Sequence, residues 1–496
     1  MLCVCKASTL KPMRQAGVRS EILRACSIVL AASIPYAITL TGFYLIDDVK
    51  MILRGVYPHK YLIFHDPLLI GKGFFRPLVI VLCRIDGFFW STSAGGYRFS
   101  NIILFTAISV LLYFFLRRWT TPLPAWFAAL VFALHPINVG TVAWISGRVD
   151  LLPAMLLMAT ALLMIGTSSV AALTAGNMFF AAALFSKEIA ITFPIVIWLG
   201  EILLAGKDIR SATRRSALPF IMVFAYLAGR FAVDFWPHDQ FYSPFQQINT
   251  YGWLGNAFIM VTNVIYIPLP FWHPMDVFVS ILEPGWERAP ELTWAIIYFL
   301  SFGIILPLLV LRVVRDRGRK RAMFFGLAWF FITAIPSIHI LRSMGGSRYL
   351  CLSVVGAALI IAVVVRELGS NFKPVRHYFL AAAFLAICLT SNIIEQKRWR
   401  EAMDLAEISA YKVEACAEKL PYGSKLIVFD MPHYSPAGRP LYPSFDTYSL
   451  HSSYRLIVGR PRVRVVRGVA DMRKFCKTSG IYCISWEKLT KGKCPE

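Results

Sequence analysis

Long apolar runs separated by clusters of Lys and Arg recur along most of this sequence. A run of about 20 apolar residues crosses the hydrocarbon core of a bilayer as a helix, because a helix satisfies its own backbone hydrogen bonds. Charged residues make up only 16% of the chain, compared with about 25% in a typical soluble protein. The pattern predicts a polytopic α-helical membrane protein.

The basic charge of the chain agrees with this interpretation. The formal net charge is +23, and much of it lies in short connections between apolar runs, as the positive-inside rule expects of cytoplasmic loops. We therefore predict no binding to nucleic acid. The basic stretch before the first run includes Arg14, Arg19 and Arg24. It predicts a cytoplasmic N-terminus and, without a small-residue cleavage site, an uncleaved anchor.

Alternating the apolar runs across the bilayer gives about eleven spans. The expected spans are 22–46, 97–116, 124–134, 149–165, 171–185, 189–204, 218–233, 292–311, 324–335, 349–365 and 378–394. Residues 47–97 would form a long outer loop with an interfacial helix at 77–89. We expect 253–271 to be a re-entrant or surface helix, or one of a hairpin pair, because otherwise the basic cluster at 312–321 would lie outside.

Residues 395–496 follow the membrane domain of residues 1–394, and parity places them outside as a small soluble α/β domain. Helical periodicity covers 399–420, and strands are expected at 425–429 and 462–466. The domain has 18 Lys and Arg residues against 11 Asp and Glu residues. This charge either only keeps the domain soluble or attracts an anionic acceptor. Cys476 and Cys483 either pair or remain free thiols.

Asp47 and Asp48 end the first apolar run. Charge is unfavourable inside a bilayer, so two acids at the end of a span are expected at the water boundary. A solvated helix end is the simplest interpretation. However, the C-terminal end of a helix dipole favours cations, so the pair should be held by a basic side chain, a metal or a substrate.

Further polar groups fall on the same side of the membrane in this topology. They are His65 and Asp66 with Arg76, His135 with Arg148 and Asp150, Lys187 with Glu188, and Arg342 with Arg348. Each has an ordinary explanation: His135 ends a helix before a proline, and Arg148 pairs with Asp150. Lys187 would extend to the interface, and Glu188 would stabilise the next helix N-terminus. Together, both signs of charge on one face of an apolar protein predict a site for an anionic polar substrate.

Two common catalytic motifs are missing from the sequence. Neither a G-x-x-x-x-G-K-[ST] loop nor an H-E-x-x-H motif occurs. Nucleotide-driven transport and zinc-dependent hydrolysis therefore have no support.

A series of longer motifs gives the sequence a family resemblance. In chain order they are L-I-D-D, F-R-P-L, G-Y-R-F-S-N, A-L-H-P-I-N, V-A-W-I-S-G-R-V-D-L-L, L-F-S-K-E-I-A-I-T and S-R-Y-L-C-L-S-V-V-G. Over residues 20–395 the sequence resembles the GT-C superfamily of membrane glycosyltransferases. It is most similar to the transmembrane and tetratricopeptide-repeat-containing O-mannosyltransferases and their bacterial relatives. The repeats of that family are not visible in this sequence, and a basic α/β-like tail stands in their place.

The resemblance implies an inverting sugar transfer from a polyprenyl-phosphate donor, outside the membrane, to a hydroxyl of an acceptor protein or of an envelope glycan or lipid. It also implies a bacterial inner-membrane location. Asp47 matches the first acid of the family's pair and would be the general base. Asp48 would orient the acceptor or hold a divalent metal, Mg²⁺ or Mn²⁺, although metal use is left open.

The remaining predicted site residues serve the donor. Arg148, Lys187 and Arg348 would bind its phosphate, since guanidinium and ammonium groups both suit phosphate oxygens. The residues expected to contact the sugar or support the site are His65, Asp66, Arg76, His135, Asp150 and Glu188.

Two other classes of function compete with the enzyme. A transporter of lipid or polyprenyl-linked sugar would often show two related halves with a site at mid-membrane, and no such repeat is visible. A non-catalytic membrane binding protein would not need the acid pair, which is present at Asp47 and Asp48. Both arguments favour the glycosyltransferase.

Overall fold

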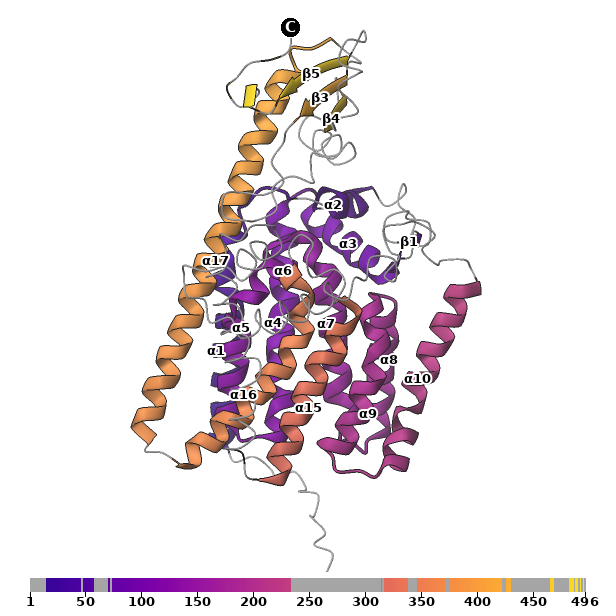
Figure 1. The fold of residues 1–496 in the computed structure, drawn as a ribbon, viewed down its shortest axis with the longest axis vertical. Helices are drawn as coiled ribbons and strands as arrows, with labels where there is room; N and C mark the ends of the chain where they lie inside the picture. The colour runs from indigo at the N-terminus through magenta and orange to yellow at the C-terminus, as the bar shows by residue number, and fades with distance from the viewer. Residues whose placement is uncertain are drawn as a thin grey trace, which may run out of the picture.

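A computed structural model gives the fold of the chain. It describes residues 15–45, 48–57, 70–71, 74–232, 314, 316–337, 346–371, 374–421, 425–429, 464–467, 481–485, 487–488, 491 and 494. Most described helices run side by side along one direction, and a small sheet lies beyond one end of them (Figure 1). This arrangement confirms the expected all-helical polytopic membrane domain.

The first apolar run is not one continuous helix. It forms α1 (Gln15–Ser33) and a 3-10 turn, η1 (Pro35–Thr39), and residues 42–45 have no regular structure. Asp48 then begins the short helix α2 (Asp48–Val56). The prediction that the acidic pair closes a helix was therefore wrong for Asp48, which stands at a helix N-terminus, where the dipole favours a carboxylate.

The expected outer loop at 47–97 contains ordered elements besides α2. A short antiparallel pair joins β1 (Ile70–Gly71) to β2 (Phe74–Phe75). Helix α3 (Pro77–Trp90) follows and starts with a proline, whose missing N–H is not needed at that position. Helices α2 and α3 lie against each other at the upper end of the bundle (Figure 1). The helix expected at 77–89 is thus present, and its placement at the membrane interface stays a prediction.

The next helices form the core of the bundle. They are α4 (Ala94–Trp119), α5 (Pro122–Leu134), α6 (Val139–Ala143) and α7 (Arg148–Met164). The 3-10 turns η2 (Pro136–Asn138) and η3 (Ile145–Gly147) join them. The axis bends by 47° between α5 and the η2–α6 segment, because Pro136 interrupts the helix. The short segments α6 and η3 between α5 and α7 pack against α4.

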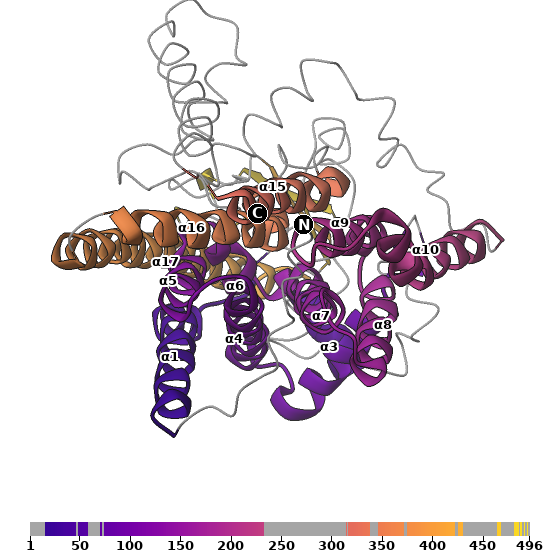
Figure 2. The same cartoon turned by 90° about the horizontal axis from the view of Figure 1, so that it is seen from below.

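A second set of helices packs beside this core. It consists of α8 (Val170–Leu184), η4 (Glu188–Thr192), α9 (Phe193–Leu203) and α10 (Ile209–Ala232). Seen from below, α10 lies at the outer edge of the bundle, next to α8 and α9 (Figure 2).

The last membrane helices close the other side. They are α15 (Arg317–Ala334), η8 (Ile335–Ser337), η9 (Gly346–Leu350), α16 (Cys351–Asn371) and α17 (Pro374–Ala417). A Cβ at Gly326 would come within 2.7 Å of the Gly356 carbonyl oxygen, so the backbones of α15 and α16 approach each other more closely there than a larger residue would allow.

Helix α17 is longer than any expected span. Its 44 residues run without a break through the boundary expected at 394/395, and the helix expected separately at 399–420 is its continuation. The division into two domains stays a prediction.

The tail carries a parallel three-stranded sheet. Its order is β4 (Arg464–Arg467), β3 (Lys425–Phe429), β5 (Ile481–Ser485), with β3 in the centre. The predicted strand at 425–429 is confirmed. The strand expected at 462–466 is described as β4 from Arg464 onward, and residues 462 and 463 lie outside the described residues.

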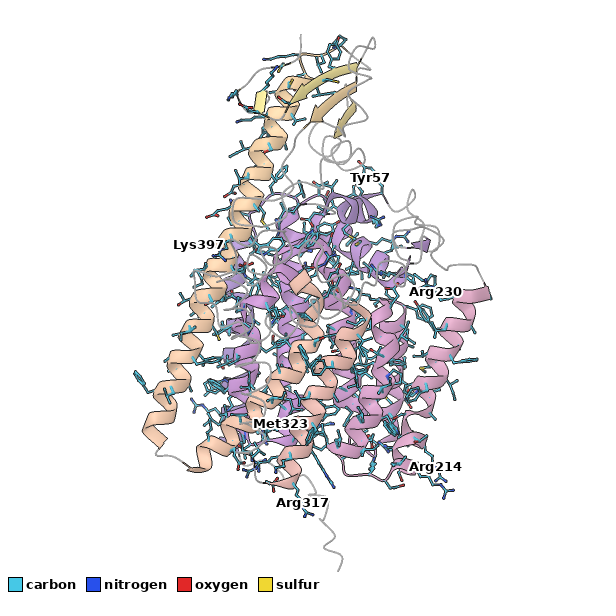
Figure 3. All side chains as sticks on the ribbon, in the orientation of Figure 1. Tyr57, Arg214, Arg230, Arg317, Met323 and Lys397 are labelled. Carbon is cyan, nitrogen blue, oxygen red and sulfur yellow. The ribbon has the colours of Figure 1, made fainter. Side chains whose placement is uncertain are left out.

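Five described helices are long and apolar enough to span a membrane, or six if the bent pair around Pro136 is one span. The five are Val18–Thr39, Ala94–Trp119, Ile145–Met164, Arg348–Leu368 and Phe379–Val413. Basic Arg214 and Arg317 lie at the lower end of the bundle, opposite Tyr57 at the upper end (Figure 3). The protein is thus an integral membrane protein with several spans. The total of about eleven spans stays a prediction, and the expected span 292–311 and the expected re-entrant or surface helix 253–271 lie outside the described residues.

Candidate functional site

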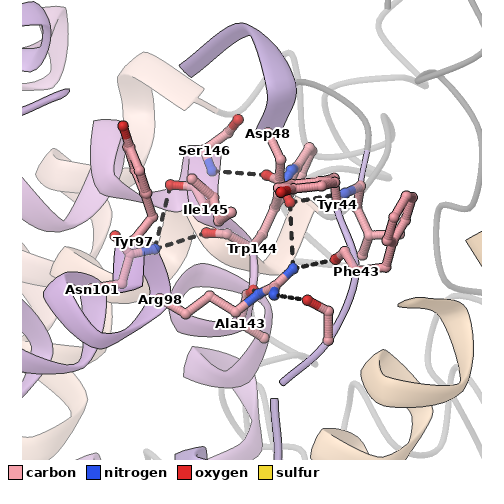
Figure 4. Close-up of polar contacts among 12 residues, drawn as sticks. Phe43, Tyr44, Asp48, Tyr97, Arg98, Asn101, Ala143, Trp144, Ile145 and Ser146 are labelled. Atoms are coloured by element: carbon pink, nitrogen blue, oxygen red, sulfur yellow. Dashed lines mark hydrogen bonds and ion pairs between the residues drawn. The ribbon is translucent and has the colours of Figure 1, made fainter. Parts of the chain in front are cut away.

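Asp48 lies at the centre of a buried polar cluster at the upper end of the bundle. Its side chain is 0% exposed. One carboxylate oxygen accepts from the Leu45 N–H at 2.9 Å, and the other accepts from the Ser146 N–H at 3.2 Å. The Arg98 guanidinium is 3.7 Å away (Figure 4). Asp48 is therefore buried, its charge is balanced by Arg98, and it links residue 45 to η3. The prediction that Asp48 lies at the water boundary was wrong.

Arg98 holds the chain that leads to Asp48. It is fully buried on α4 and donates to the carbonyl oxygens of Gly42 and Phe43, and to that of Ala143 at 2.9 Å (Figure 4). One guanidinium thus fixes the irregular segment 42–45 against the end of α6. Because a buried carbonyl without a partner is costly, this segment depends on Arg98 for its conformation.

Asn101 fixes the other side of the cluster. It lies one turn after Arg98 on the same face of α4, and its amide nitrogen reaches the carbonyl oxygen of Trp144 at 2.9 Å. A Cβ at Gly147 would come within 1.9 Å of the Thr141 carbonyl oxygen, so the turn at 141–147 closes on itself only with glycine there. The position of the Ser146 N–H that binds Asp48 follows from these contacts.

Arg148 points away from the other predicted donor ligands. It is 0% exposed and forms an ion pair with Asp86 of α3. It also donates to the carbonyl oxygens of Tyr97 at 2.9 Å and Ile145 at 3.0 Å. The alternative of a pair between Arg148 and Asp150 is wrong, because the start of α7 turns these two side chains to different neighbours. Arg148 joins α3, α4 and α7.

Lys187 and Arg348, by contrast, meet at Asp150. The Lys187 ammonium forms an ion pair with one Asp150 oxygen, and the Arg348 Nε lies 3.9 Å from the other. Lys187 does not extend to an interface, since it is only 7% exposed.

Aromatic rings enclose these two cations. The Arg348 guanidinium carbon is 4.1 Å from the centroid of the Trp144 ring, and the Lys187 Nζ is 4.6 Å from that of Tyr349. We call Asp150, Lys187, Arg348, Trp144 and Tyr349 the cation cluster.

The cation cluster is joined to the Asp48 cluster through residues 141–150. The Thr141 hydroxyl donates to the Arg348 carbonyl oxygen at 3.3 Å, and the chain from Thr141 to Asp150 includes Ser146, which binds Asp48. Both clusters therefore depend on the same ten-residue connection, 141–150.

Glu188 forms a separate group with two arginines. Its carboxylate accepts from Arg76 at 2.8 Å, and Arg230 of α10 lies 3.8 Å away. Burial acts to raise the pKa of Glu188, but Arg76 and the neighbouring Lys187 hold the pKa below its usual value. Adjacent residues of the S-K-E motif thus serve two groups, with Lys187 in the cation cluster and Glu188 toward β2 and α10.

His135 has a local structural role. Its Nδ1 accepts from the Ile137 N–H at 3.2 Å, so the side chain caps η2 after α5 ends. This agrees with the simpler interpretation of His135 as a helix end. Asp47, His65, Asp66 and Arg342 lie outside the described residues.

A divalent metal does not fit the described part of the acid pair. Both Asp48 oxygens accept backbone N–H groups, and the Arg98 cation already balances the charge. Among the described residues no group of three or more His, Cys, Asp or Glu side chains is arranged to hold a metal ion. A metal bound through Asp47 stays a prediction.

Several structurally important residues were not among the predicted site residues. Arg98 and Asn101 belong to the quoted G-Y-R-F-S-N motif, and their spacing within an apolar span was a usable signal, since polar side chains there need partners. Asp86 offered the same signal, because it lies within the apolar stretch 77–89 and there needs a partner. Arg230 offered no comparable signal, because it stands near the end of an apolar run like any flanking basic residue.

The sequence is similar to that of a curated protein. No family model matches the sequence. The chain is 26% identical over 431 residues to the Caenorhabditis elegans protein O-mannosyl-transferase F38B6.6. The match covers 79% of this chain and 58% of that protein, so the chain spans less than two thirds of its relative.

Solved structures give weaker likenesses. ArnT from Cupriavidus metallidurans bound to undecaprenyl phosphate is 14% identical, with a TM-score of 0.46, over 97% of this chain and 91% of that one. Oligosaccharyltransferase AglB from Archaeoglobus fulgidus, with an inhibitory peptide and a dolichol-phosphate, is 12% identical with a TM-score of 0.45. That alignment covers 91% of this chain and 65% of AglB. Such scores do not establish a shared fold.

Proposed function

We propose that this chain is an integral-membrane glycosyltransferase of the GT-C type. It would transfer a sugar from a polyprenyl-phosphate donor to an acceptor hydroxyl on the extracytoplasmic face, with inversion. The curated O-mannosyl-transferase relative and the quoted motifs support this activity. The observation that carries the proposal is that residues 141–150 contact both Asp48 and the segment of Arg348, so that the acid and the cation cluster are held by one stretch of chain.

The cation cluster suits the donor phosphate. Lys187 and Arg348 both lie at Asp150, beside the aromatic rings of Tyr349 and Trp144, and ammonium and guanidinium groups both suit phosphate oxygens. Fixed cations in a site shielded from water stabilise charge that develops on a leaving phosphate. Arg148 is the weakest of the three predicted phosphate ligands, because Asp86 and two carbonyl groups already occupy its guanidinium.

Asp47 and Asp48 have different roles in this proposal. Asp47 would accept the hydroxyl proton while the acceptor oxygen forms its bond to the anomeric carbon. The bond between that carbon and the phosphate breaks, and its electron pair leaves on the phosphate next to Lys187 and Arg348. Asp48 would position Asp47 by fixing the start of α2, since Asp48 is buried and tied to Leu45 and Ser146.

The outward placement of the site also has support. Arg214 and Arg317 lie at the end of the bundle opposite Tyr57, which follows the helix α2 that Asp48 begins (Figure 3). The positive-inside rule expects the cytoplasm at the end with these arginines. Cys483 in the tail is disulfide-bonded, and disulfides persist in oxidising compartments. Labelling a cysteine introduced at Ser452 with a membrane-impermeant reagent tests the orientation, and labelling only from the cytoplasmic side would contradict it.

The transfer reaction provides the central test. Purified protein in detergent is given a polyprenyl-phosphate sugar and an acceptor, and transferred sugar is measured. Asp47→Asn should reduce turnover at least 100-fold, as loss of a general base does, with unchanged Tm. Asp208→Asn is the matched control, because Asp208 is exposed and caps α10 through the Ser211 N–H, a role that Asn also performs. Near-normal turnover by Asp47→Asn would remove the proposed base.

A further inference from the structure

A buried stripe on α17 lies beside the candidate site. Beyond residue 394, where the last membrane span was expected to end, Trp399, Ala402, Met403 and Ala406 are 0–2% exposed. Their spacing places them on one face of the helix, and α17 packs against η1 and α6. This face of α17 therefore contacts the segments that lead to both clusters of the site.

Trp399 reaches the cation cluster through one aromatic ring. Its ring centroid lies 6.2 Å from that of Trp144, with an angle of 35° between the planes. The Arg348 guanidinium carbon lies 4.1 Å from the centroid of the same Trp144 ring. The Trp399 indole N–H donates to the Glu395 carboxylate, one turn earlier, at 3.1 Å. Trp399 is thus held in one orientation and supports the ring against which Arg348 packs.

Met403 contacts the acid-bearing segment from the same helix face. A Cβ at Gly42 would come within 2.1 Å of the Met403 sulfur, so this side chain packs directly on the Gly42 backbone. The Gly42 carbonyl oxygen accepts from Arg98, which also pairs with Asp48. Met403 therefore supports the start of the segment that Arg98 fixes.

We propose that this face of α17 positions both parts of the site. Trp399 holds Arg348 toward the donor phosphate by supporting Trp144, and Met403 holds the segment that leads to Asp47. Both are positioning residues that act through their neighbours. The proposal rests on the proposed sugar transfer, and it adds that the helix that carries the tail takes part in the reaction.

Simple attachment of α17 to the bundle is the alternative role for this face. Substitutions would then lower the stability of the protein but leave the kinetics of the folded fraction unchanged. A positioning role instead predicts kinetic effects that differ between the two contacts. Stability and kinetics are therefore both measured, on full-length protein purified in detergent.

Trp399→Leu removes the supporting ring. It should raise KM for the polyprenyl-phosphate donor about tenfold, because Arg348 is no longer held by its aromatic support, while kcat changes little. Trp399→Phe keeps a ring and loses only the bond to Glu395, so its KM should stay within about twofold of the wild-type value. Trp399→Met, which also lacks a ring, replaces Trp399→Leu if that variant does not fold.

A double variant shows whether Trp399 acts through Arg348. In a protein that carries Arg348→Met, adding Trp399→Leu should not raise KM further, because residues that act through one contact are not additive. Trp126→Leu is the matched control, since Trp126 is a packed tryptophan of α5 that donates to Ser27 at 2.7 Å. It should lower Tm without changing KM. Additive effects of Trp399→Leu and Arg348→Met would overturn the proposed link.

Met403→Ala tests the second contact. It should lower kcat about tenfold with an unchanged donor KM, since a displaced acid-bearing segment affects the chemical step rather than donor binding. Wild-type kinetics in folded Trp399→Leu and Met403→Ala would overturn the positioning role and leave the proposed function intact.

A binding measurement separates this inference from the proposed function. Absence of sugar transfer by the wild-type protein would contradict the proposed function. The rise in Tm that undecaprenyl phosphate causes would still report phosphate binding. We expect a smaller rise for Trp399→Leu than for the wild type and Trp126→Leu, and equal rises would refute the support of Arg348 by Trp399.

Discussion

Replacing Arg148 by methionine separates a structural role from a donor-binding role. Arg148 is 0% exposed, and Asp86 is 3% exposed. Without Arg148, Asp86 would keep a hydrogen bond from Ser100 at 2.6 Å but would lose its charge partner. Removing one member of a buried ion pair costs about 3–5 kcal/mol. We therefore expect Arg148→Met to unfold at a markedly lower temperature than the wild type.

The double variant gives the decisive comparison. Arg148→Met with Asp86→Leu removes both charges. It also removes the Arg148 hydrogen bonds to the carbonyl groups of Tyr97 and Ile145 and to Asn101 Oδ1, and it leaves the Ser100 hydroxyl without its Asp86 acceptor. Each lost hydrogen bond costs about 1 kcal/mol, so the double variant should be more stable than Arg148→Met by about 1–3 kcal/mol. Arg214→Met, on the exposed lower end of the bundle, is the control for loss of a basic residue.

Thermal unfolding in detergent and donor kinetics are measured for each variant. Our reasoning predicts a loss of stability that is partly restored by the second substitution. If Arg148→Met kept the wild-type Tm and instead raised KM for the polyprenyl-phosphate donor, the structural reasoning would be refuted and phosphate binding by Arg148 supported.

Three further predictions concern stability. Gly147→Ala should lower Tm strongly, because its Cβ would lie 1.9 Å from the Thr141 carbonyl oxygen; an unchanged Tm would mean that the turn at 141–147 can open. Gln396→Met should raise stability by about 1–2 kcal/mol, since both amide atoms of Gln396 are buried and have no hydrogen-bond partner among the described residues; a lower Tm would contradict this. Because the pKa of Glu188 is held below its usual value, its bond to Arg76 stabilises the protein above the unfolded pKa of about 4.3 and is lost as pH falls. Wild-type Tm should therefore fall more steeply on acidification than that of Glu188→Gln, and parallel curves would argue against the shift.

Local sequence patterns predicted the helices and strands better than they predicted which residues contact one another. The strand at 425–429 and the span at 97–116 follow from apolar runs, and the structure places them at Lys425–Phe429 and Ala94–Trp119. Hydropathy cannot distinguish a continuous helix from a broken one, which is why the irregular segment before Asp48 was missed.

The candidate site required contacts between distant parts of the chain. Sequence proximity suggested that Arg148 pairs with Asp150, but Asp86, far earlier in the chain, is its partner. The burial of Asp48 likewise depends on Arg98 and Ser146. The S-K-E and S-R-Y motifs did identify Lys187 and Arg348, which the structure brings together at Asp150.

Helix α17 makes the bundle and the tail mechanically continuous. Its 44 residues correspond to a rod of about 66 Å. Near its middle, Asn392 binds the Tyr36 hydroxyl at 3.2 Å, and Trp399 packs against Trp144 of the cation cluster. The rod is held at these points and carries the sheet at its far end (Figure 1). A small tilt around Asn392 would swing the sheet through a wide arc while moving Trp144 and Arg348 only slightly, so a force on the tail would reach the site as a torque.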